Sequence, residues 1–389
     1  MKGLSFPFTH EATFVSRINR FKVSCLLDGK EVFAYLPNPG RLWDILAPGR
    51  KVYLAESPEG SLPTLIAAEK DSLPILLHTH YTNRVAQFLI DHGLVPSLSG
   101  LNVKGKEVRV RDRRFDLLLS DGREDLILEV KSCTLFGERI ALFPDAKTER
   151  GAAHLLLLRE ISKRGMRAGM LFVVHSPKVS FFLPHYHLDA EFSKILFQAR
   201  ESVLIKAVSV GWKVAERRLE LLPTAKELEI PWHILKKEAG DRGLYLLVLR
   251  LESDAVVGVG RKGTFSLRAG YYIYVGSSKR GLEKRVRRHK RRRKRLFWHM
   301  DYLSREAKDM KDIVIRTNSL GECELAHLVA SIFSPILGFG SSDCRCPSHL
   351  FFSRDNPLGS EHFLRLIQYV QIDRLDDLLG SNARNSPLF

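Results

Sequence analysis

Two charged side chains interrupt a run of β-forming residues in the segment ILEVKS, residues 127–132. Because a strand directs alternate side chains to opposite faces, Glu129 and Lys131 share one face with Ile127. An acid and a base in this arrangement on an edge strand are often only a solvated pair, and edge lysines discourage further strand pairing. The alternative is a site whose chemistry needs both groups.

The residues upstream favour a site. The segment RRFDLLLSDGREDLILEVKS predicts two strands, at 114–119 and 126–131, joined by an Asp-Gly turn, and this hairpin brings Asp116 toward Glu129. Two ionised carboxylates at short range repel each other, so their approach normally needs a cation such as Mg²⁺ or Mn²⁺. Lys131 could orient water or stabilise charge on a phosphate. Together the three residues predict metal-assisted hydrolysis of a phosphodiester.

An Asp on one strand followed by Glu-x-Lys on the next resembles the PD-(D/E)XK nuclease signature. The segments LPNPGRLWDIL, ILEVKSCTLFGERIALFPDAKTERGAAHL and GMLFVVHSPKVSFFLPHYHLD are together similar to the SfsA family, named for sugar fermentation stimulation, over about residues 10–222. The resemblance implies an OB-like β-barrel at 1–78 and a PD-(D/E)XK nuclease-like mixed-sheet domain at 79–222. It also implies that Asp116 and Glu129 are metal ligands and that Lys131 is catalytic.

The first part of the chain suits a small barrel. Its short β-rich runs, at 22–27, 31–36 and 51–55, are separated by turns rich in Gly, Pro, Asp and Asn. The turn before Arg41 could be only a tight connection, since Pro39 and Gly40 set its backbone. Because loops often carry functional residues, Arg41 is also a candidate phosphate contact.

Two expected helices flank the hairpin. The later one begins after Thr148, which can cap it, and its first turns carry Arg150 and His154. An ordinary solvated turn would explain these residues, but a helix N-terminus also favours phosphate, so both are candidate substrate contacts. The earlier helix, in YTNRVAQFLIDHG, offers Asn83 and Arg84 as supporting candidates.

The composition is that of a globular protein. Its 389 residues suggest two or three domains, and 44% of them are hydrophobic without an uncharged apolar run of membrane-spanning length. The first residues lack a sustained apolar stretch and a cleavage site, which argues against secretion. The five cysteines are an odd number spread over a long chain, so we expect them to be reduced and the protein to be cytoplasmic.

Most of the formal net charge of +17 comes from residues 279–295, KRGLEKRVRRHKRRRKR, where twelve Lys or Arg and one Glu amount to +11. Like charges at helical spacing repel each other, and binding to phosphates would offset this repulsion through counterion release. A membrane surface is a poorer partner because the segment lacks an apolar face. We therefore expect DNA as the partner, with RNA as a second candidate and no membrane contact. The candidate contacts are Arg285, Arg288, Arg291 and Arg292.

A second module follows an expected linker at 223–239, where prolines interrupt the β/α pattern. The strands in GLYLLVLRL and GYYIYVGSS resemble the two motifs of the GIY-YIG nuclease domain, with Tyr245, Tyr274 and, on the next helix, Arg285. Tyrosines in strands are usually packing residues. The segments GYYIYVGSSKRG, FWHMDYL and GFGSSDCRCPSHLFF are similar to a GIY-YIG-related family of uncharacterised domains, which implies a domain at 240–355, followed by a helical tail at 356–389.

The resemblance is incomplete at the metal-binding acid. Active GIY-YIG enzymes use a tyrosine, an arginine and a helical glutamate that holds one divalent metal. The helix in GECELAHLVASIF has Glu322 and Glu324 near its start, but Val329 and Ala330 stand where the acid is expected. This domain is therefore expected to bind nucleic acid rather than to cleave it.

A Cys-x-Cys pair, Cys344 and Cys346, precedes His349 and could indicate zinc. A structural zinc site normally takes four ligands at recognised spacings, and no second pair of ligands accompanies this one in the sequence. Cys323 is the only other thiol nearby. We interpret the segment as a packed turn.

These patterns predict a multidomain α/β and α+β protein with an OB-like barrel, a nuclease-like mixed sheet and a GIY-YIG-like α/β domain. The leading hypothesis is a nuclease for DNA or RNA that uses Mg²⁺ or Mn²⁺. The first alternative is a non-catalytic DNA-binding regulator of sugar metabolism that retains a nuclease fold. The second is an interaction scaffold, in which the basic segment binds RNA and the acids form an inert cluster.

Overall fold

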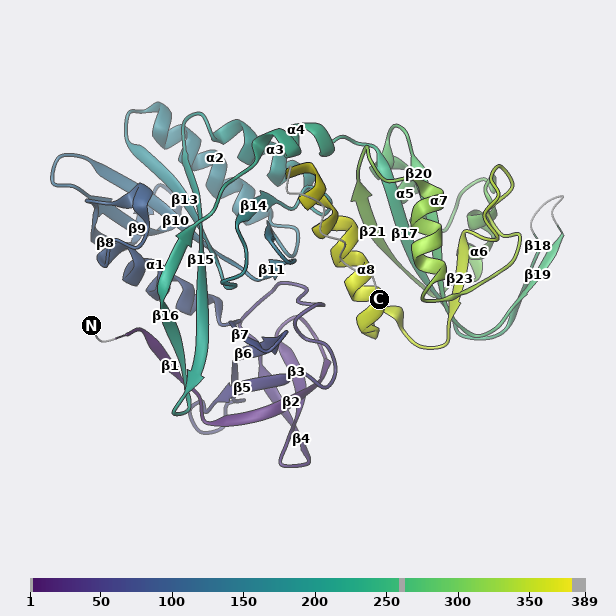
Figure 1. Cartoon of the computed structure of the whole chain (residues 1–389), viewed down its shortest axis with the longest axis horizontal. Helices are drawn as coiled ribbons and strands as arrows, with labels where there is room; N and C mark the ends of the chain where they lie inside the picture. Colours follow the sequence, from purple (N-terminus) through teal and green to yellow (C-terminus); the bar gives the residue numbers. More distant parts are fainter. Residues whose placement is uncertain (1–2, 259–262, 380–389) are drawn as a thin grey trace. The chain divides into compact units, whose positions relative to one another are not determined.

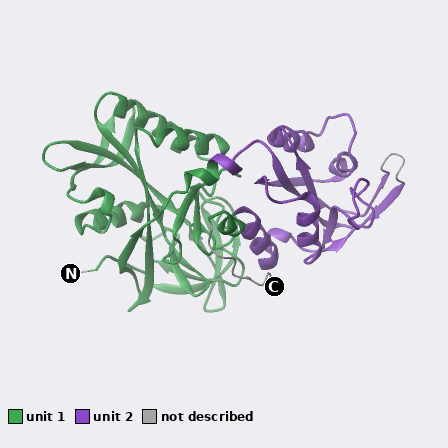
Figure 2. Cartoon of the chain, turned by 45° about the horizontal axis from the view of Figure 1, so that its top comes forward, with its two compact units in different colours: residues 1–235, 372–389 green, residues 236–371 purple. Residues whose placement is uncertain are grey.

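The structure is a computed structural model that describes residues 3–258 and 263–379. These residues form two compact units (Figure 2). Unit 1 contains the chain up to residue 235 and again from residue 372, and unit 2 contains residues 236–371. Of the predicted tail at 356–389, residues 380–389 lie outside the described residues.

The N-terminal barrel of unit 1 is a six-stranded sheet in the order β4-β3-β2-β5-β6-β7. A pairing between Tyr35 and Thr64 joins β4 to β6 and closes the sheet. The β-rich runs predicted at 22–27 and 51–55 are confirmed as β3 and β5. The strands are β2 (His10–Arg17), β3 (Lys22–Leu27), β4 (Lys30–Tyr35), β5 (Lys51–Ala55), β6 (Thr64–Lys70) and β7 (Leu73–Leu76).

A seven-stranded sheet, in the order β1-β16-β15-β13-β10-β9-β8, forms the second part of unit 1 (Figure 1). Its strands are β1 (Ser5–Pro7), β8 (Asn102–Val110), β9 (Arg113–Ser120), β10 (Asp125–Cys133), β13 (Arg167–Val174), β15 (Leu204–Ala215) and β16 (Arg218–Glu227). The sheet is mixed, because β10 runs antiparallel to β9 and parallel to β13. β10 lies between two strands only up to Leu128, and from Glu129 to Cys133 it pairs with β13 alone, so the burial of Glu129 rather than the strand position argues against a merely solvated pair.

Two expected boundaries differ from the structure. β1 lies in the residues assigned to the barrel, but it pairs with β16 of the large sheet. The expected linker at 223–239 contains the end of β16 and the helix α4 (Trp232–Glu238). Pro223 fits within a strand because β1 pairs only with residues 218–220, so that beyond them β16 is an edge strand, where proline is tolerated.

Helices cover both faces of the large sheet. Val85 and Leu89 of α1 (Thr82–Asp91) belong to one buried cluster with Leu128 of β10. Leu155 of α2 (Glu149–Lys163) belongs to a second cluster with Ile127. The two clusters follow the alternation predicted for β10. The other elements of unit 1 are α3 (Ala190–Ala199), a small sheet of β11 (Leu135–Phe136), β12 (Ile140–Phe143) and β14 (Phe181–Pro184), and the 3-10 helices η1 (Thr79–Tyr81), η2 (Pro96–Leu98) and η5 (Asp373–Leu379).

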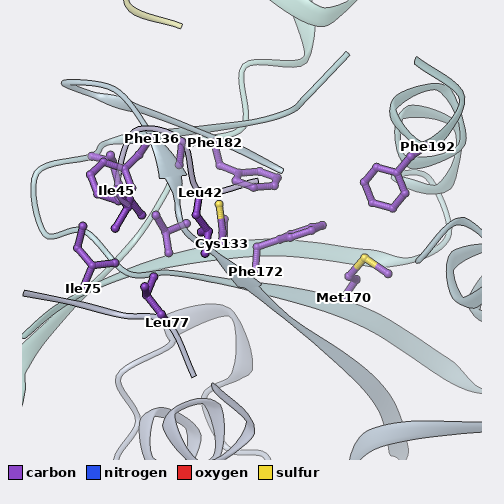
Figure 3. Close-up of a cluster of buried hydrophobic side chains, with 14 of the residues drawn as sticks. Leu42, Ile45, Ile75, Leu77, Cys133, Phe136, Met170, Phe172, Phe182 and Phe192 are labelled. Atoms are coloured by element: carbon purple, nitrogen blue, oxygen red, sulfur yellow. The ribbon is translucent and has the colours of Figure 1, made fainter. Parts of the chain in front are cut away.

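The barrel and the large sheet share one apolar core. Figure 3 shows Leu42 and Leu77 of the barrel part in the same cluster as three residues of the other strands. These are Cys133 on β10, Phe136 on β11 and Phe172 on β13. All five side chains are at most 4% exposed. The barrel is thereby fixed against the strand that carries Glu129 and Lys131.

Unit 2 is built on a five-stranded sheet in the order β21-β17-β20-β23-β22. Its strands are β17 (Gly243–Leu251), β20 (Gly270–Ser278), β21 (Asp309–Arg316), β22 (Ser334–Pro335) and β23 (Leu350–Ser353), with a separate pair, β18 (Ala255–Gly258) and β19 (Thr264–Leu267). The helices are α5 (Leu282–Lys290), α6 (His299–Glu306), α7 (Glu322–Ala330) and α8 (Glu361–Gln371), with η4 (Pro357–Gly359) before α8. This is a mixed α/β unit. The more specific GIY-YIG assignment stays a prediction.

No helix in the described part of the chain is long and apolar enough to cross a membrane.

Candidate functional site

The predicted hairpin places two carboxylates side by side in unit 1. The last paired residues of β9 and β10 are Leu117 and Leu128, so that Asp116 and Glu129 are the next residue on each strand. Asp116 Oδ2 accepts a hydrogen bond from the backbone N–H of Val130 at 2.7 Å, which ties its side chain to β10.

Glu129 is 3% exposed and its two oxygens have different surroundings. Oε1 accepts hydrogen bonds from Lys131 Nζ and, at 2.6 Å, from His154 Nδ1 on α2. Oε2 is buried and has no hydrogen-bond partner among the described residues. A buried acceptor is normally satisfied, so this oxygen is a marked exception.

The electrostatics of the two acids differ as well. Burial raises the pKa of Asp116 to about 6, and the charge of Glu129 adds to this shift because two carboxylates repel each other. Burial acts in the same direction on Glu129, but the hydrogen bond from His154 and the charge of Lys131 outweigh it and lower the pKa of Glu129. At neutral pH both acids are therefore anionic and close together.

These residues fit a divalent cation. A hard cation takes oxygen ligands, and the pair offers two carboxylates, one with a buried oxygen that no described residue satisfies. A cation would also remove the repulsion that raises the pKa of Asp116. The residues that could hold it are Asp116 and Glu129.

Of the supporting candidates of unit 1, two contact the carboxylate pair and two have other surroundings. Asn83 Nδ2 donates to Asp116 Oδ1 at 2.7 Å, and His154 contacts Glu129, so both belong to the site. Arg84 lies over the ring of Phe6, at 5.0 Å from the guanidinium carbon to the ring centroid. Arg150 is exposed at the start of α2.

Arg41 is held by the protein itself. Its Nε donates to the carbonyl oxygen of Asp145 at 2.9 Å, and its guanidinium lies 4.6 Å from the ring centroid of Trp43. Asp145 Oδ2 also accepts from the backbone of Leu42 at 2.6 Å, so the acid closes this turn. The contacts support the interpretation of the turn as a tight connection.

The residues of the second candidate site come together in unit 2. The rings of Tyr245 and Tyr274 have their centroids 6.3 Å apart, and Arg285 on α5 donates to the carbonyl oxygen of Ser277 at 2.8 Å. Gly276 pairs with Tyr245 across the strands, and a Cβ at this glycine would lie only 2.4 Å from the tyrosine ring. Burial raises the pKa of both tyrosines above the ordinary value, which favours the neutral hydroxyl.

One acid, Glu322, lies close to this cluster. Glu322, at the first position of α7, lies near enough to both tyrosines to contribute to their raised pKa values. Its Oε1 accepts from His349 Nδ1 at 2.9 Å and its Oε2 accepts from Ser277 Oγ. Val329 and Ala330, where the acid was expected, lie near the end of α7, whereas Glu322 at its start bonds to Ser277 of β20.

The basic segment is divided between paired and exposed side chains. Arg288 donates to both carboxylate oxygens of the buried Asp301, at 2.9 and 3.0 Å, so the prediction that it contacts nucleic acid is not supported. Lys290 pairs with Asp312 at 2.6 Å. Arg291 and Arg292 follow the end of α5 and are exposed, which leaves them available to a polyanion.

Family models match three consecutive parts of the chain. Residues 15–77 match the SfsA N-terminal OB domain, and residues 80–216 match the sugar fermentation stimulation protein RE domain. Residues 244–371 match DUF123, a domain of unknown function.

Curated relatives agree with these matches. A sugar fermentation stimulation protein homolog from Methanothermobacter thermautotrophicus is 35% identical over 193 residues, which are 49% of this chain and 80% of that protein. The chain belongs to the SfsA family. A second SfsA-family relative, the homolog from Chloroflexus aurantiacus, is 34% identical over 226 residues, 57% of this chain and 84% of that protein. The solved structure of Pyrococcus furiosus SfsA in complex with Ca²⁺ is 26% identical with a TM-score of 0.54, and the match covers 59% of this chain and 99% of that chain.

Proposed function

We propose that this SfsA-family protein is a metal-dependent nuclease whose site consists of Asp116, Glu129 and Lys131. The observation that carries the proposal is the convergence, beside a lysine, of a partly buried Asp116 and a buried Glu129, one oxygen of which has no partner among the described residues. An inert salt-bridge cluster would leave no such oxygen, because burying an unpaired anionic group is costly. The Ca²⁺ in the solved SfsA relative supports a divalent-cation site in this fold.

Each residue has a distinct task in this proposal. Asp116 and Glu129 hold Mg²⁺ or Mn²⁺, which when bound supplies positive charge to a phosphate and favours ionisation of the attacking water. Lys131, bonded to Glu129 and 18% exposed at its side chain, would supply a positive charge to a phosphate oxygen bound beside the acids. His154 and Asn83 keep the two carboxylates in place through their hydrogen bonds.

Unit 2 supplies affinity in this proposal. Its exposed Arg291 and Arg292, with Arg150 near the start of α2 in unit 1, can contact phosphates without reading bases. The buried tyrosines and the fully bonded Glu322 favour a binding role over a second catalytic centre. DNA is the proposed partner, with RNA as a second candidate.

The test is cleavage of end-labelled single- and double-stranded DNA and RNA by the full chain. We expect cleavage with Mg²⁺ or Mn²⁺ and none with EDTA. Binding to the same substrates is measured in parallel at matched salt. If the protein binds these substrates but cleaves none of them with either Mg²⁺ or Mn²⁺, the nuclease is rejected and the non-catalytic DNA-binding regulator is left.

A further inference from the structure

Four potential metal ligands, none of them part of the carboxylate pair of unit 1, meet in unit 2. They are Cys323, Cys344, Cys346 and His349, and each offers a ligand atom within 4.8 Å of all the others. Cys323 comes from the first turn of α7, and the other three come from residues 336–349, a described segment without a helix or strand. The sequence favoured a packed turn because Cys323 was a single distant thiol rather than part of a second ligand pair, and the fold brings it beside the other three from α7.

The spacing of the ligand atoms suits a tetrahedral ion. Zinc bonds of about 2.3 Å to sulfur and about 2.0 Å to nitrogen place ligand atoms about 3.5 to 3.8 Å apart in a tetrahedron. Cys344 Sγ and His349 Nε2 are 3.4 Å apart. The other pairs of ligand atoms are at most 4.8 Å apart, so binding an ion would shorten these distances by about 1 Å or less. Three thiols and one imidazole form a soft donor set, which selects Zn²⁺ over the Mg²⁺ or Mn²⁺ of the carboxylate pair.

A second observation concerns the orientation of His349. Its Nδ1 is bonded to Glu322 Oε1 at 2.9 Å, which leaves Nε2 facing the thiols. Because an ionised carboxylate can only accept, this contact fixes the proton on Nδ1 and the lone pair on Nε2. Metal-bound histidines are commonly held in this way by an acid behind the ring. The site therefore has an outer partner as well as four ligands.

We propose that Cys323, Cys344, Cys346 and His349 bind one structural Zn²⁺, with Glu322 orienting the histidine. Four protein ligands fill a tetrahedral site and leave no position for substrate, so the ion has a structural role. It fixes the segment 336–349 to the start of α7. It also keeps Glu322 between His349 and Ser277, which removes this acid from catalysis near Tyr274.

The first experiment measures metal content in the full chain purified without chelators. We expect about one zinc per chain in the wild type and less than one fifth of that in Cys344→Ser. Cys25→Ala is the matched control, because Cys25 is a buried thiol in the barrel and should leave the zinc content unchanged. A wild type with only trace zinc, or equal zinc in wild type and Cys344→Ser, would overturn the proposal.

A second experiment avoids variants that fail to fold. Apo wild-type protein is titrated with Co²⁺, and we expect the intense absorption of Co²⁺–thiolate bonds, which the carboxylate pair cannot produce. Glu322→Gln keeps all four ligands, so it should retain the stoichiometry but weaken zinc about 10- to 100-fold in a chelator competition. Absence of thiolate absorption, with the cysteines kept as reduced thiols during the titration, would contradict the metal site. Unchanged zinc affinity in Glu322→Gln would contradict the orienting role.

Discussion

Two glutamates, a buried one in unit 1 and a partly buried one in unit 2, differ in which hydrogen bonds their oxygens accept. Glu129 in unit 1 has one oxygen bonded to His154 and Lys131 and another with no partner among the described residues. Glu322 in unit 2 has a hydrogen bond to each oxygen, from His349 and Ser277. Since a cation needs a donor atom that the protein leaves open, the first glutamate suits catalysis and the second suits structure. An acid near other reactive residues is therefore not enough to indicate a catalytic centre.

The largest expected effect comes from removing the charge of the first glutamate. Glu129→Gln keeps the size of the side chain but removes one anionic ligand, so we expect cleavage to fall about 100-fold or more. Affinity for DNA should change little, because it depends on Lys and Arg elsewhere. Rates and affinities are measured beside Glu124→Gln, an exposed acid in the turn of the same hairpin. Equal cleavage by Glu129→Gln and wild type would exclude this site.

The pH dependence of metal binding tests the carboxylate pair directly. The folded-state pKa of Asp116, about 6, lies above its ordinary value of 3.8, so the metal-free fold favours the protonated acid and loses this contribution as the pH rises through about 6. A cation needs the ionised form. Its affinity should therefore rise about tenfold per pH unit below pH 6 and level off above it. Mn²⁺ titrations from pH 5 to 8 measure this, and a flat profile in wild type would show that Asp116 is not a ligand.

A smaller effect is expected from the exposed arginines of unit 2. Replacing Arg291, Arg292 and Arg293 with Gln should weaken binding to many sequences and reduce the slope of log affinity against log salt by about 2 to 3, if each contacts a phosphate. The same positions changed to Lys keep the charge and should keep the slope. An unchanged slope in the Gln variant would assign these side chains to another partner.

The smallest effect is expected from separating the units. A fragment of residues 1–238 contains the barrel, the large sheet and the small sheet of unit 1, so we expect cleavage within about threefold of the full chain at low salt. It lacks Asp373, whose Oδ1 accepts from the backbone of Glu138 at 2.8 Å, so its Tm should be lower by about 2 to 4 °C. Residues 236–389 should bind nucleic acid and cleave poorly. Strong cleavage by that fragment, lost in Tyr274→Phe, would reverse the comparison between the two glutamates.

Local patterns in the sequence predicted much of the first site. Strand alternation placed Glu129 and Lys131 on one face, and the hairpin brought Asp116 beside them. The cap at Thr148 is confirmed by its hydrogen bond from Gly151 at 3.0 Å. These features depend on neighbours within a few residues, so periodicity and turn chemistry are sufficient to find them.

Contacts between distant residues were not predictable in this way. The sequence offered Arg288 as a phosphate contact, but its charge is taken by Asp301, which reaches it from the next helix. His154 was only a secondary candidate in the sequence, and it is the packing of α2 over β10 that brings its ring to Glu129. Neither spacing nor composition reports which acid or base will face such a residue.

The sequence by itself determined the strand faces, the acidic hairpin, the concentration of positive charge and the membership of the SfsA family. Only the tertiary structure decided which of these charged groups remain open. It left Glu129 Oε2 without a partner in the described part of the chain, placed Glu322 between two donors, and added Cys323 to three ligands more than twenty residues further along the chain. The physical reason is that hydrogen bonds, burial and metal coordination depend on distances in space, which chain folding sets between residues far apart in sequence.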